Sequence, residues 1–185
     1  MSSEVAHSFD ALRDIAKKSA QFSVGLPAQE EVREYFSGIG FSLAGYQFIA
    51  GMGSVSELLH VPKYTVIPGV KAWVLGVSNI RGRLIPIIDL SRFFGVPSER
   101  IRSRDKRILV VEHNDMLSGL LVDHVQGMQH FEQEGLKNTT SEPLSKNIVA
   151  FVDVAFNRDG KDWLVFDAKR LVSDARFTSV SLTQK

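Results

Sequence analysis

The feature that most constrains the fold is a series of short apolar stretches, separated by turn residues, that runs from Ile39 to Val172. The stretch "GFSLAGYQFIAGM" is typical of a β-hairpin that turns near Gly45, with alternate residues on one face. The stretch "NIVAFVDVAFNRDGKDWLVFDA" is typical of a second hairpin, with a type I turn and a left-handed glycine at Asn157 to Gly160. Six or more such strands with few helices predict small β-barrels or a sandwich.

Two eight-residue segments repeat one pattern. "IIDLSRFF" and "VFDAKRLV" each have two apolar residues, an Asp, two spacer residues, an Arg and two more apolar residues. In each segment the Asp (Asp89 and Asp167) is expected to end a strand and cap a short helix that folds back on the sheet. The repeat predicts two similar lobes.

The first residues differ from the rest of the chain. Phe9, Leu12 and Ile15 recur at helical spacing, and a second helical stretch, "AQEEVREYF", follows Pro27. They predict a helical N-terminal extension, which either covers the edge of the main domain or docks a partner; we favour the first. The predicted domains are residues 1–37 (extension), 38–176 (main domain) and 177–185 (tail).

Composition excludes several classes of protein. The 185 residues are 44% hydrophobic and 23% charged, with a net charge of +1 and no cysteine. A folded protein without disulfides, thiol nucleophiles or Cys-ligated zinc follows. No apolar run has the length of a signal peptide or a membrane span, so we expect a cytoplasmic protein with no direct membrane insertion.

Catalytic motifs are missing from the sequence. There is no G-x-S-x-G, H-E-x-x-H or P-loop motif, and the five histidines include no i, i+4 pair. Asp123 and Asp153 lie in apolar strands, where we expect them to face solvent or pair with an arginine. We predict no catalytic residue, cofactor or metal site, although a general acid and base among the scattered carboxylates remains an alternative.

A basic cluster spans residues 100–107. It is interrupted by Asp105 and contains no aromatic residues on which bases could stack. We interpret it as a solvated linker between the lobes and predict no nucleic-acid partner. An RNA-binding barrel remains a further alternative.

The segment "GVSNIRGRLIPIIDLSRFFG" places an arginine-glycine pair in apolar strand material. Pro86 cannot donate to a sheet ladder, so its strand is expected at an edge or at a bulge. Asn79 and Gly82 tolerate the left-handed backbone of a sharp turn. Arg81 is therefore expected at a bend beside an open edge.

Two interpretations of Arg81 follow from its neighbours. It is flanked by apolar Ile80 and Leu84, an arrangement typical of an arginine that anchors a protein interface. Alternatively, it forms an internal ion pair with Glu57 or Asp89. The residues alone leave both open.

A longer segment around Arg81 carries a resemblance. "VSELLHVPKYTVIPGVKAWVLGVSNIRGRLIPIIDLSRFFG" is similar to the signature of CheW-like chemotaxis coupling domains: V-x-E-Φ, a proline region, G-V-x-N-x-R-G, x-Φ-Φ-P-Φ-Φ-D-L and a closing F-G. Weaker similarity continues through "GLLVDHVQGM" and "WLVFDAKRLV". The N-terminal arm and the phrases "GIGF", "IPGV" and "GMQHF" resemble the type IV pilus (twitching motility) branch of the family.

The resemblance implies a fold and a function. The fold would be mainly β: two intertwined five-stranded SH3-like barrels around a shared core, with the helical extension and a short C-terminal helix. The function would be that of a non-catalytic adapter. It would join the cytoplasmic tip of a methyl-accepting chemoreceptor to the regulatory domain of a CheA-type histidine kinase, in receptor arrays at the cell pole.

The resemblance also implies site residues. Receptor-binding residues would lie in or near a groove between the lobes: Arg81, Asn79, Val55, Glu57, Gly82 and Ile80. Gly76 and neighbouring apolar surface, including Phe41, would face the kinase. One departure is Arg83, which follows the glycine where the family more often has an apolar or acidic residue.

Overall fold

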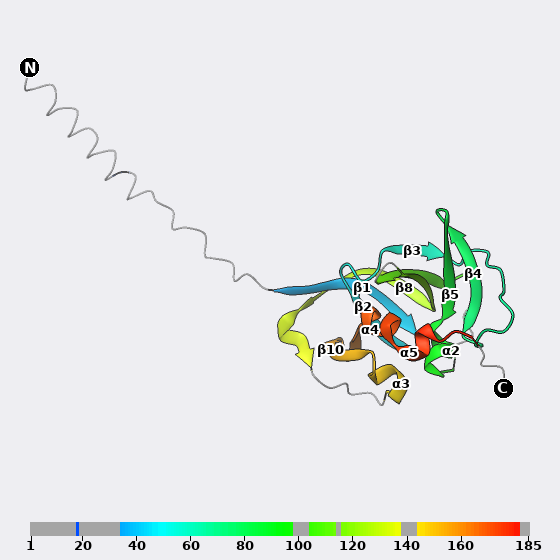
Figure 1. Ribbon diagram of the computed structural model, residues 1–185. Helices are drawn as coiled ribbons and strands as arrows, with labels where there is room; N and C mark the ends of the chain where they lie inside the picture. The colour runs from blue at the N-terminus through cyan, green and yellow to red at the C-terminus, as the bar shows by residue number, and fades with distance from the viewer. Residues whose placement is uncertain (1–17, 19–33, 98–103, 114–115, 138–143, 182–185) are drawn as a thin grey trace, which may run out of the picture. The chain divides into compact units, whose positions relative to one another are not determined.

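The computed structural model describes residue 18 and residues 34–97, 104–113, 116–137 and 144–181. Contacts divide the chain into two units, residues 1–33 and 34–185, and only the second is described here as a fold. Of the predicted helical extension, residues 1–37, the structure describes Lys18 and Glu34–Ser37. The prediction is wrong at Tyr35–Ser37, which are not helical but begin the first strand of the fold. The described part is mainly β, as predicted (Figure 1).

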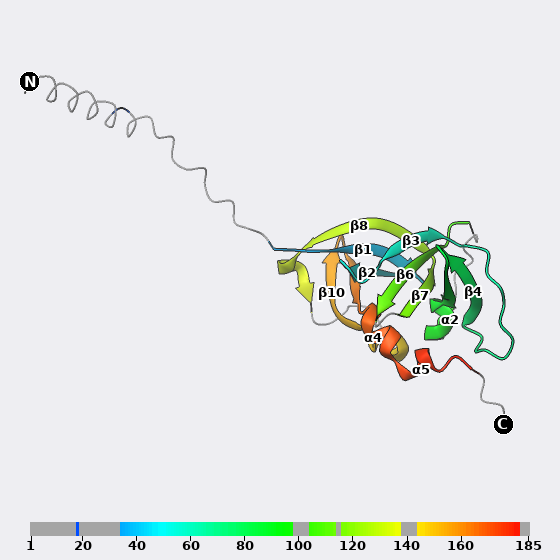
Figure 2. The ribbon, with the colours of Figure 1, turned by 45° about the horizontal axis from the view of Figure 1, so that its top comes forward.

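The elements follow one another in short segments. The strands are β1 (Tyr35–Leu43), β2 (Tyr46–Gly51), β3 (Glu57–His60), β4 (Val74–Ile80), β5 (Arg83–Asp89), β6 (Arg107–His113), β7 (Met116–Val122), β8 (His124–Glu132), β9 (Leu136–Lys137), β10 (Val152–Arg158) and β11 (Lys161–Phe166). The helices are α2 (Leu90–Phe94), the 3-10 turn η1 (Gln133–Gly135), α3 (Lys146–Val149), α4 (Ala168–Ser173) and α5 (Ala175–Thr178). Figure 2 shows α2, α4 and α5 together on one side of the strands.

The strands form two sheets through which the chain weaves. Sheet A has the order β8-β1-β2-β11-β10-β9, and sheet B has the order β3-β6-β7-β5-β4. In sheet A, the hairpin β10–β11 joins the rest of the sheet through parallel pairing of β11 with β2. In sheet B, the hairpin β4–β5 joins it through parallel pairing of β5 with β7. The short β9 is added at one edge of sheet A. The predicted pair of intertwined β lobes is confirmed.

The repeated eight-residue pattern occupies equivalent places in the two sheets. Asp89 ends β5 and accepts a hydrogen bond from the backbone N–H of Arg92, which caps α2. Asp167 follows β11 and accepts from the N–H of Arg170, which caps α4. Both arginines also contact the capping carboxylate, at 3.3 and 3.6 Å. The sequence repeat therefore reflects a structural repeat.

Apolar side chains fill a shared core and two smaller cores. The shared core contains Phe41 and Phe48, whose stacked rings are 5.2 Å apart, with Phe166 against both. Sheet B encloses a core around Ile85, Ile87 and Ile108, and sheet A one around Ile49, Phe131 and Phe156. A core inside each curled sheet and a third between them is the packing expected of two joined barrels.

Three two-residue hairpin turns have positive φ at both central positions. They are Ala44–Gly45, Arg81–Gly82 and Asp159–Gly160. Positive φ at both positions defines a type I′ turn, whose twist matches that of paired strands. The type I turn predicted at Asn157 to Gly160 is therefore wrong.

Two other local predictions are corrected by the strand order. The strand with Pro86, β5, lies inside sheet B between β4 and β7 and not at an edge. Its parallel ladder with β7 starts at Ile87, so Pro86 precedes the positions where an N–H is needed, and the β4–β5 bulge lies between Val74 and Gly76. The basic segment joins α2 to β6; because β5 and β6 share sheet B, it does not link the two lobes.

Candidate partner-binding site

The β4–β5 hairpin presents Arg81 at its tip. Arg81 and Gly82 form the turn, with φ of 52° and 82°, and the N–H of Gly82 donates to Oδ1 of Asn79 at 2.8 Å. Asn79 lies within β4 and closes the turn through its side chain, so the left-handed residues are Arg81 and Gly82 and not Asn79. A residue other than glycine rarely adopts the left-handed conformation, so the backbone of Arg81 at the hairpin tip is unusual.

Arg81 forms an ion pair that spans sheet B. Its Nη2 lies 2.7 Å from Oε1 of Glu57, although β3 and β4 occupy opposite ends of the strand order. The Arg81 side chain is nevertheless 80% exposed, and that of Glu57 is 22% exposed. The guanidinium is thus both paired within the chain and open to solvent, while Asp89 pairs with Arg92 instead.

The other residues assigned to the receptor side differ in exposure. Asn79 and Gly82 are exposed beside Arg81. Val55 is partly buried against the shared core, and Ile80 is partly buried against the core of sheet B. The apolar members therefore hold the hairpin and β3 in place, and the polar members face outward.

The two residues assigned to the kinase side are structural. Phe41 is fully buried in the shared core, so its side chain cannot contribute to a binding surface, and its assignment there is corrected. Gly76 is buried where β4 meets Thr65, and a Cβ at Gly76 would lie 2.2 Å from the Thr65 carbonyl oxygen. The close approach explains the glycine.

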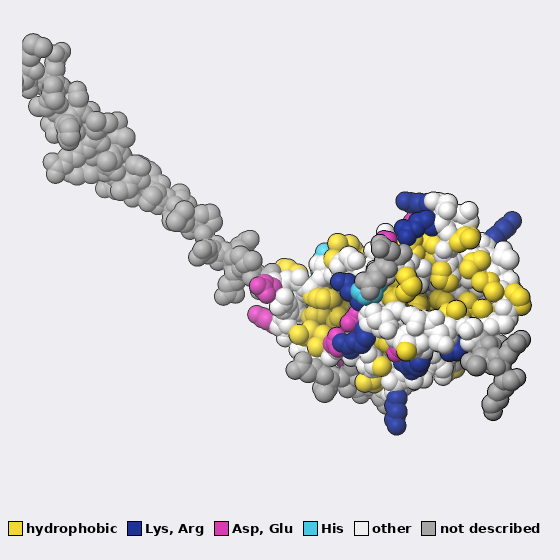
Figure 3. Space-filling view, in the orientation of Figure 1, with side chains coloured by type: hydrophobic (Ala, Val, Ile, Leu, Met, Phe, Trp, Pro, Cys, Tyr) yellow, Lys and Arg dark blue, Asp and Glu magenta, His cyan; other side chains and the backbone are white. Residues whose placement is uncertain are grey.

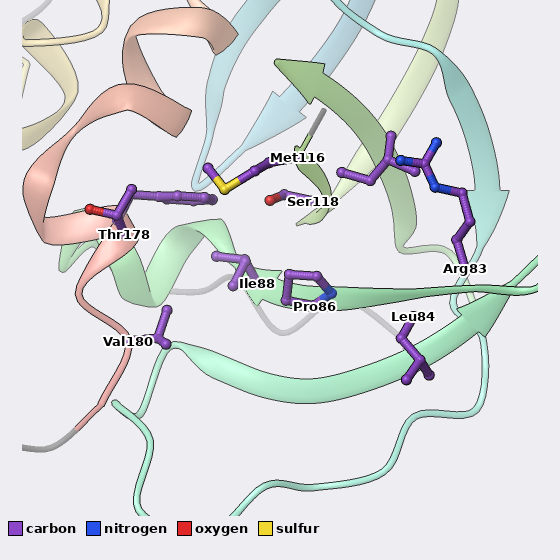
Figure 4. A pocket seen from close by; sticks show the side chains of 10 residues that line it. Arg83, Leu84, Pro86, Ile88, Met116, Ser118, Thr178 and Val180 are labelled. Carbon is purple, nitrogen blue, oxygen red and sulfur yellow. The ribbon is translucent and has the colours of Figure 1, made fainter. Parts of the chain in front are cut away.

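An apolar groove lies beside the Arg81 hairpin. It encloses about 370 Å³ between β5, β7 and the end of α5, and we call it the β5–α5 groove. Figure 4 shows Arg83 and Thr178 at opposite ends, with Pro86 and Ile88 on its floor. Leu84, 74% exposed, and Met116 offer unusually large apolar surfaces to solvent.

Sequence reasoning missed most of this groove. Its lining is contributed by three segments far apart in the chain: Arg83–Ile88, Met116–Ser118 and Phe177–Val180. No local sequence pattern predicts that these three segments lie side by side. The one residue that could have indicated the groove is Leu84, an apolar side chain on the solvent-facing side of its strand. Figure 3 shows hydrophobic side chains gathered over the part of the molecule that holds β4 and β5, with Lys and Arg side chains above them.

Sheet A has an arginine in the place equivalent to the Arg81 hairpin. Arg158 ends β10, and its Nη1 donates to Oε1 of Gln129 on β8 at 2.9 Å. Its guanidinium lies over the ring of Phe131, 3.8 Å from the centroid, and also donates to the carbonyl of His130. Each sheet therefore has an arginine that reaches from the hairpin tip to the strand at the other end.

The scattered ionisable residues are held by local partners. Asp153 pairs with Arg170 at 2.7 Å, as the sequence predicts, whereas Asp123 is buried and lies 3.5 Å from the ammonium of Lys106 rather than beside an arginine. The side-chain hydrogen bond from Arg176 lowers the pKa of Asp174. Within the described ranges, no group of three His, Asp or Glu side chains is placed to hold a metal ion. The described helices are also all too short or too polar to cross a membrane.

Two interwoven curled sheets with repeated Asp-capped helices define a CheW-like fold. A CheW-like domain model matches residues 37–176, and the chain belongs to this family, as the resemblance predicts. It is 43% identical over 97% of its length to Protein PilI of Pseudomonas aeruginosa, of which it covers 99%. It is 30% identical to chemotaxis protein CheW of Helicobacter pylori, over 74% of this chain and 79% of that one.

A solved structure shares the fold. The crystal structure of scaffolding protein TtCheW from Thermoanaerobacter tengcongensis superimposes with a TM-score of 0.66 at 25% identity. The match covers 77% of this chain and 96% of that one. The relatives are thus CheW-type proteins, one of them described as a scaffold.

Proposed function

We propose that this protein is a non-catalytic adapter of a type IV pilus chemosensory system. It joins the cytoplasmic tip of a chemoreceptor to the regulatory domain of a CheA-type histidine kinase. Similarity to PilI over almost the whole chain, and to CheW proteins, supports the assignment to this class of chemosensory adapter. The observation that carries the site is the exposed Arg81 guanidinium on a two-residue turn, closed by the Asn79 side chain, beside the β5–α5 groove.

The groove and the hairpin suit a helical partner. Apolar side chains on one face of a helix fill a groove of this kind, as in other helix-in-groove complexes. Arg81 supplies a planar fork of N–H donors for a carboxylate or carbonyl oxygen of that helix. Because Glu57 already accepts from Arg81, a partner acid must share the guanidinium with Glu57 or displace it.

The adapter domain comprises the predicted residues 38–176, together with Tyr35–Ser37 of β1 and the buried Phe177 of α5, which the prediction assigned to the extension and the tail. Its receptor side comprises Arg81, Asn79, Val55, Glu57, Gly82 and Ile80. The kinase contacts a different face, formed by surface residues around the buried Gly76 and not by Gly76 or Phe41 themselves. Receptor movement would alter the kinase only if the adapter makes different contacts in the two signalling states. The protein acts in the cytoplasm and is recruited to receptor arrays at the cell pole.

The test is binding of a purified receptor tip to the Arg81→Glu variant. Because Arg81 is exposed, its replacement should leave the fold intact. We expect receptor binding and receptor-dependent kinase control to be lost. Arg104→Glu makes the same charge change at an exposed arginine outside the site and should bind as the wild type does. Unchanged receptor binding by Arg81→Glu would remove this site from the proposal.

A further inference from the structure

The chain passes from sheet B to sheet A through one residue, Asp123. It lies between Val122, the last residue of β7, and His124, the first of β8. The residue is 1% exposed, which is unusual for an aspartate on a connection between two sheets. Its contacts therefore bear directly on how the two sheets are held together.

On the side of sheet A, Asp123 fixes the β1–β2 turn. Its Oδ2 accepts from the N–H of Ala44 at 2.8 Å, and its own N–H donates to the carbonyl of Ser42. Ala44 has a φ of 51°, a left-handed conformation that is strained for a residue with a Cβ. The hydrogen bond to the carboxylate stabilises this strained turn from outside the hairpin.

On the side of sheet B, Asp123 faces Lys106. Its Oδ1 lies 3.5 Å from Nζ of Lys106, and it accepts no hydrogen bond from the described residues. Lys106 immediately precedes β6, whose first residue, Arg107, pairs with Val122. The Arg107 guanidinium donates to the carbonyls of Arg104 and Lys106, which holds this end of β6.

We propose that Asp123 is an electrostatic link that transmits changes at the Lys106 end of β6 to the β1–β2 turn of the other sheet. The same carboxylate contacts both sheets: Oδ1 faces the ammonium of Lys106, which compensates the charge, and Oδ2 accepts the hydrogen bond from the N–H of Ala44. If Lys106 loses its charge, the buried carboxylate is left uncompensated, which is strongly unfavourable. It then turns toward water and releases the Ala44 N–H. This link rests on the contacts above and not on the proposed function.

The experiment measures amide hydrogen exchange at Ala44 by NMR in the full chain. Lys106→Met changes sheet B only, yet we expect exchange at Ala44 to accelerate about tenfold as its hydrogen bond weakens. Lys106→Met combined with Asp123→Asn removes the uncompensated charge and keeps an oxygen acceptor for Ala44. Exchange in the double variant should return to within about threefold of the wild type. Lys161→Met, at an exposed lysine of sheet A, is the matched control and should change nothing at Ala44.

The outcomes are distinguishable. Unchanged exchange at Ala44 in Lys106→Met, or equally fast exchange in the double variant, overturns the link. If Lys106→Met does not fold but the double variant does, the rescue supports it. If neither folds, Asp123 and Lys106 act separately and the proposal is wrong.

Discussion

Arg81 and Glu57 join the two ends of a five-stranded sheet. Glu57 lies on β3, the first strand in the order of sheet B, and Arg81 lies at the tip of the hairpin that holds the last strand. The 2.7 Å contact between them brings these ends together, and the partly buried Leu59 of β3 and Ile80 of β4 both pack against the core of sheet B. The residue proposed to bind a receptor therefore also closes its own barrel.

A charge swap separates these two roles. The double variant Arg81→Glu with Glu57→Arg restores an ion pair at the same place. Because exposed pairs contribute little, we expect its free energy of unfolding to stay within about 1 kcal/mol of the wild type. Receptor binding should still be lost, since the cation now extends from β3. Restored binding in a titration with the receptor tip would show that the pair, and not the position of Arg81, is recognised.

Removing the two capping aspartates should destabilise the protein. Asp89→Ala and Asp167→Ala each remove a side-chain hydrogen bond to a helix N–H, at a cost of about 1 kcal/mol. The Asp89 carboxylate is the more buried, so its loss should cost more. Urea denaturation measures both. Asparagine at either position keeps an acceptor and should retain most of the stability; equal losses for Asn and Ala would refute the capping role.

Gly76→Ala tests the close approach at β4. The new Cβ would meet the Thr65 carbonyl oxygen at 2.2 Å, and backbone on both sides resists movement. We expect a loss of about 1–3 kcal/mol in the free energy of unfolding, as for other overpacked sites. Gly53→Ala is the control, because that glycine also has positive φ but its Cβ would enter open space. Similar losses in the two variants would mean that backbone conformation, and not the contact, requires Gly76.

Phe41 and Leu84 should respond in opposite ways. Phe41→Ala removes a buried ring from the shared core and should cost about 3–5 kcal/mol of stability. Leu84→Ala alters an exposed side chain and should change stability by about 0.5 kcal/mol or less. Its effect should instead be weaker receptor binding, measured by titration at equal folded concentration. If Leu84→Ala bound the receptor tip as tightly as the wild type does, the β5–α5 groove would be excluded as part of the receptor-binding site.

The Asp174–Arg176 pair predicts a small acid-dependent loss of stability. The side-chain hydrogen bond from Arg176 lowers the pKa of Asp174 in the folded state below its ordinary value. The unfolded state therefore takes up the proton first as the pH falls. The contribution is complete above the ordinary pKa and disappears as the pH falls through the lowered one. Urea midpoints of the wild type and Asp174→Asn should converge as the pH falls through the lowered pKa of Asp174; a constant difference would contradict this.

Much of this fold could be predicted from local sequence signals. Asp89 and Asp167 were identifiable as caps, and Gly45 as a turn, because each acts on residues beside it in the chain. The interior position of β5 was not, because it depends on parallel pairing with β7 across the intervening α2 and β6. For the same reason, alternation could place Phe41 on a face but could not show that two sheets bury that face.

The ion pair at the site shows the same limit. Glu57 was one of two acids proposed to face Arg81, and only the closure of sheet B selects it over Asp89. The groove was missed because its walls meet only after the end of α5 has packed beside β5 and β7. The turn at Arg81–Gly82 was thus predictable from neighbouring residues, whereas surfaces built from distant segments were not.

The weave of the chain has a consequence for synthesis on the ribosome. Sheet B is made from consecutive strands, β3 to β7, whereas β2 in sheet A acquires its parallel neighbour only when β11 emerges. Sheet B can therefore fold while translation continues. The β1–β2 hairpin remains without its parallel partner during this time, and its aromatic face stays exposed. Nascent chains arrested before β11 should be the ones that chaperones retain.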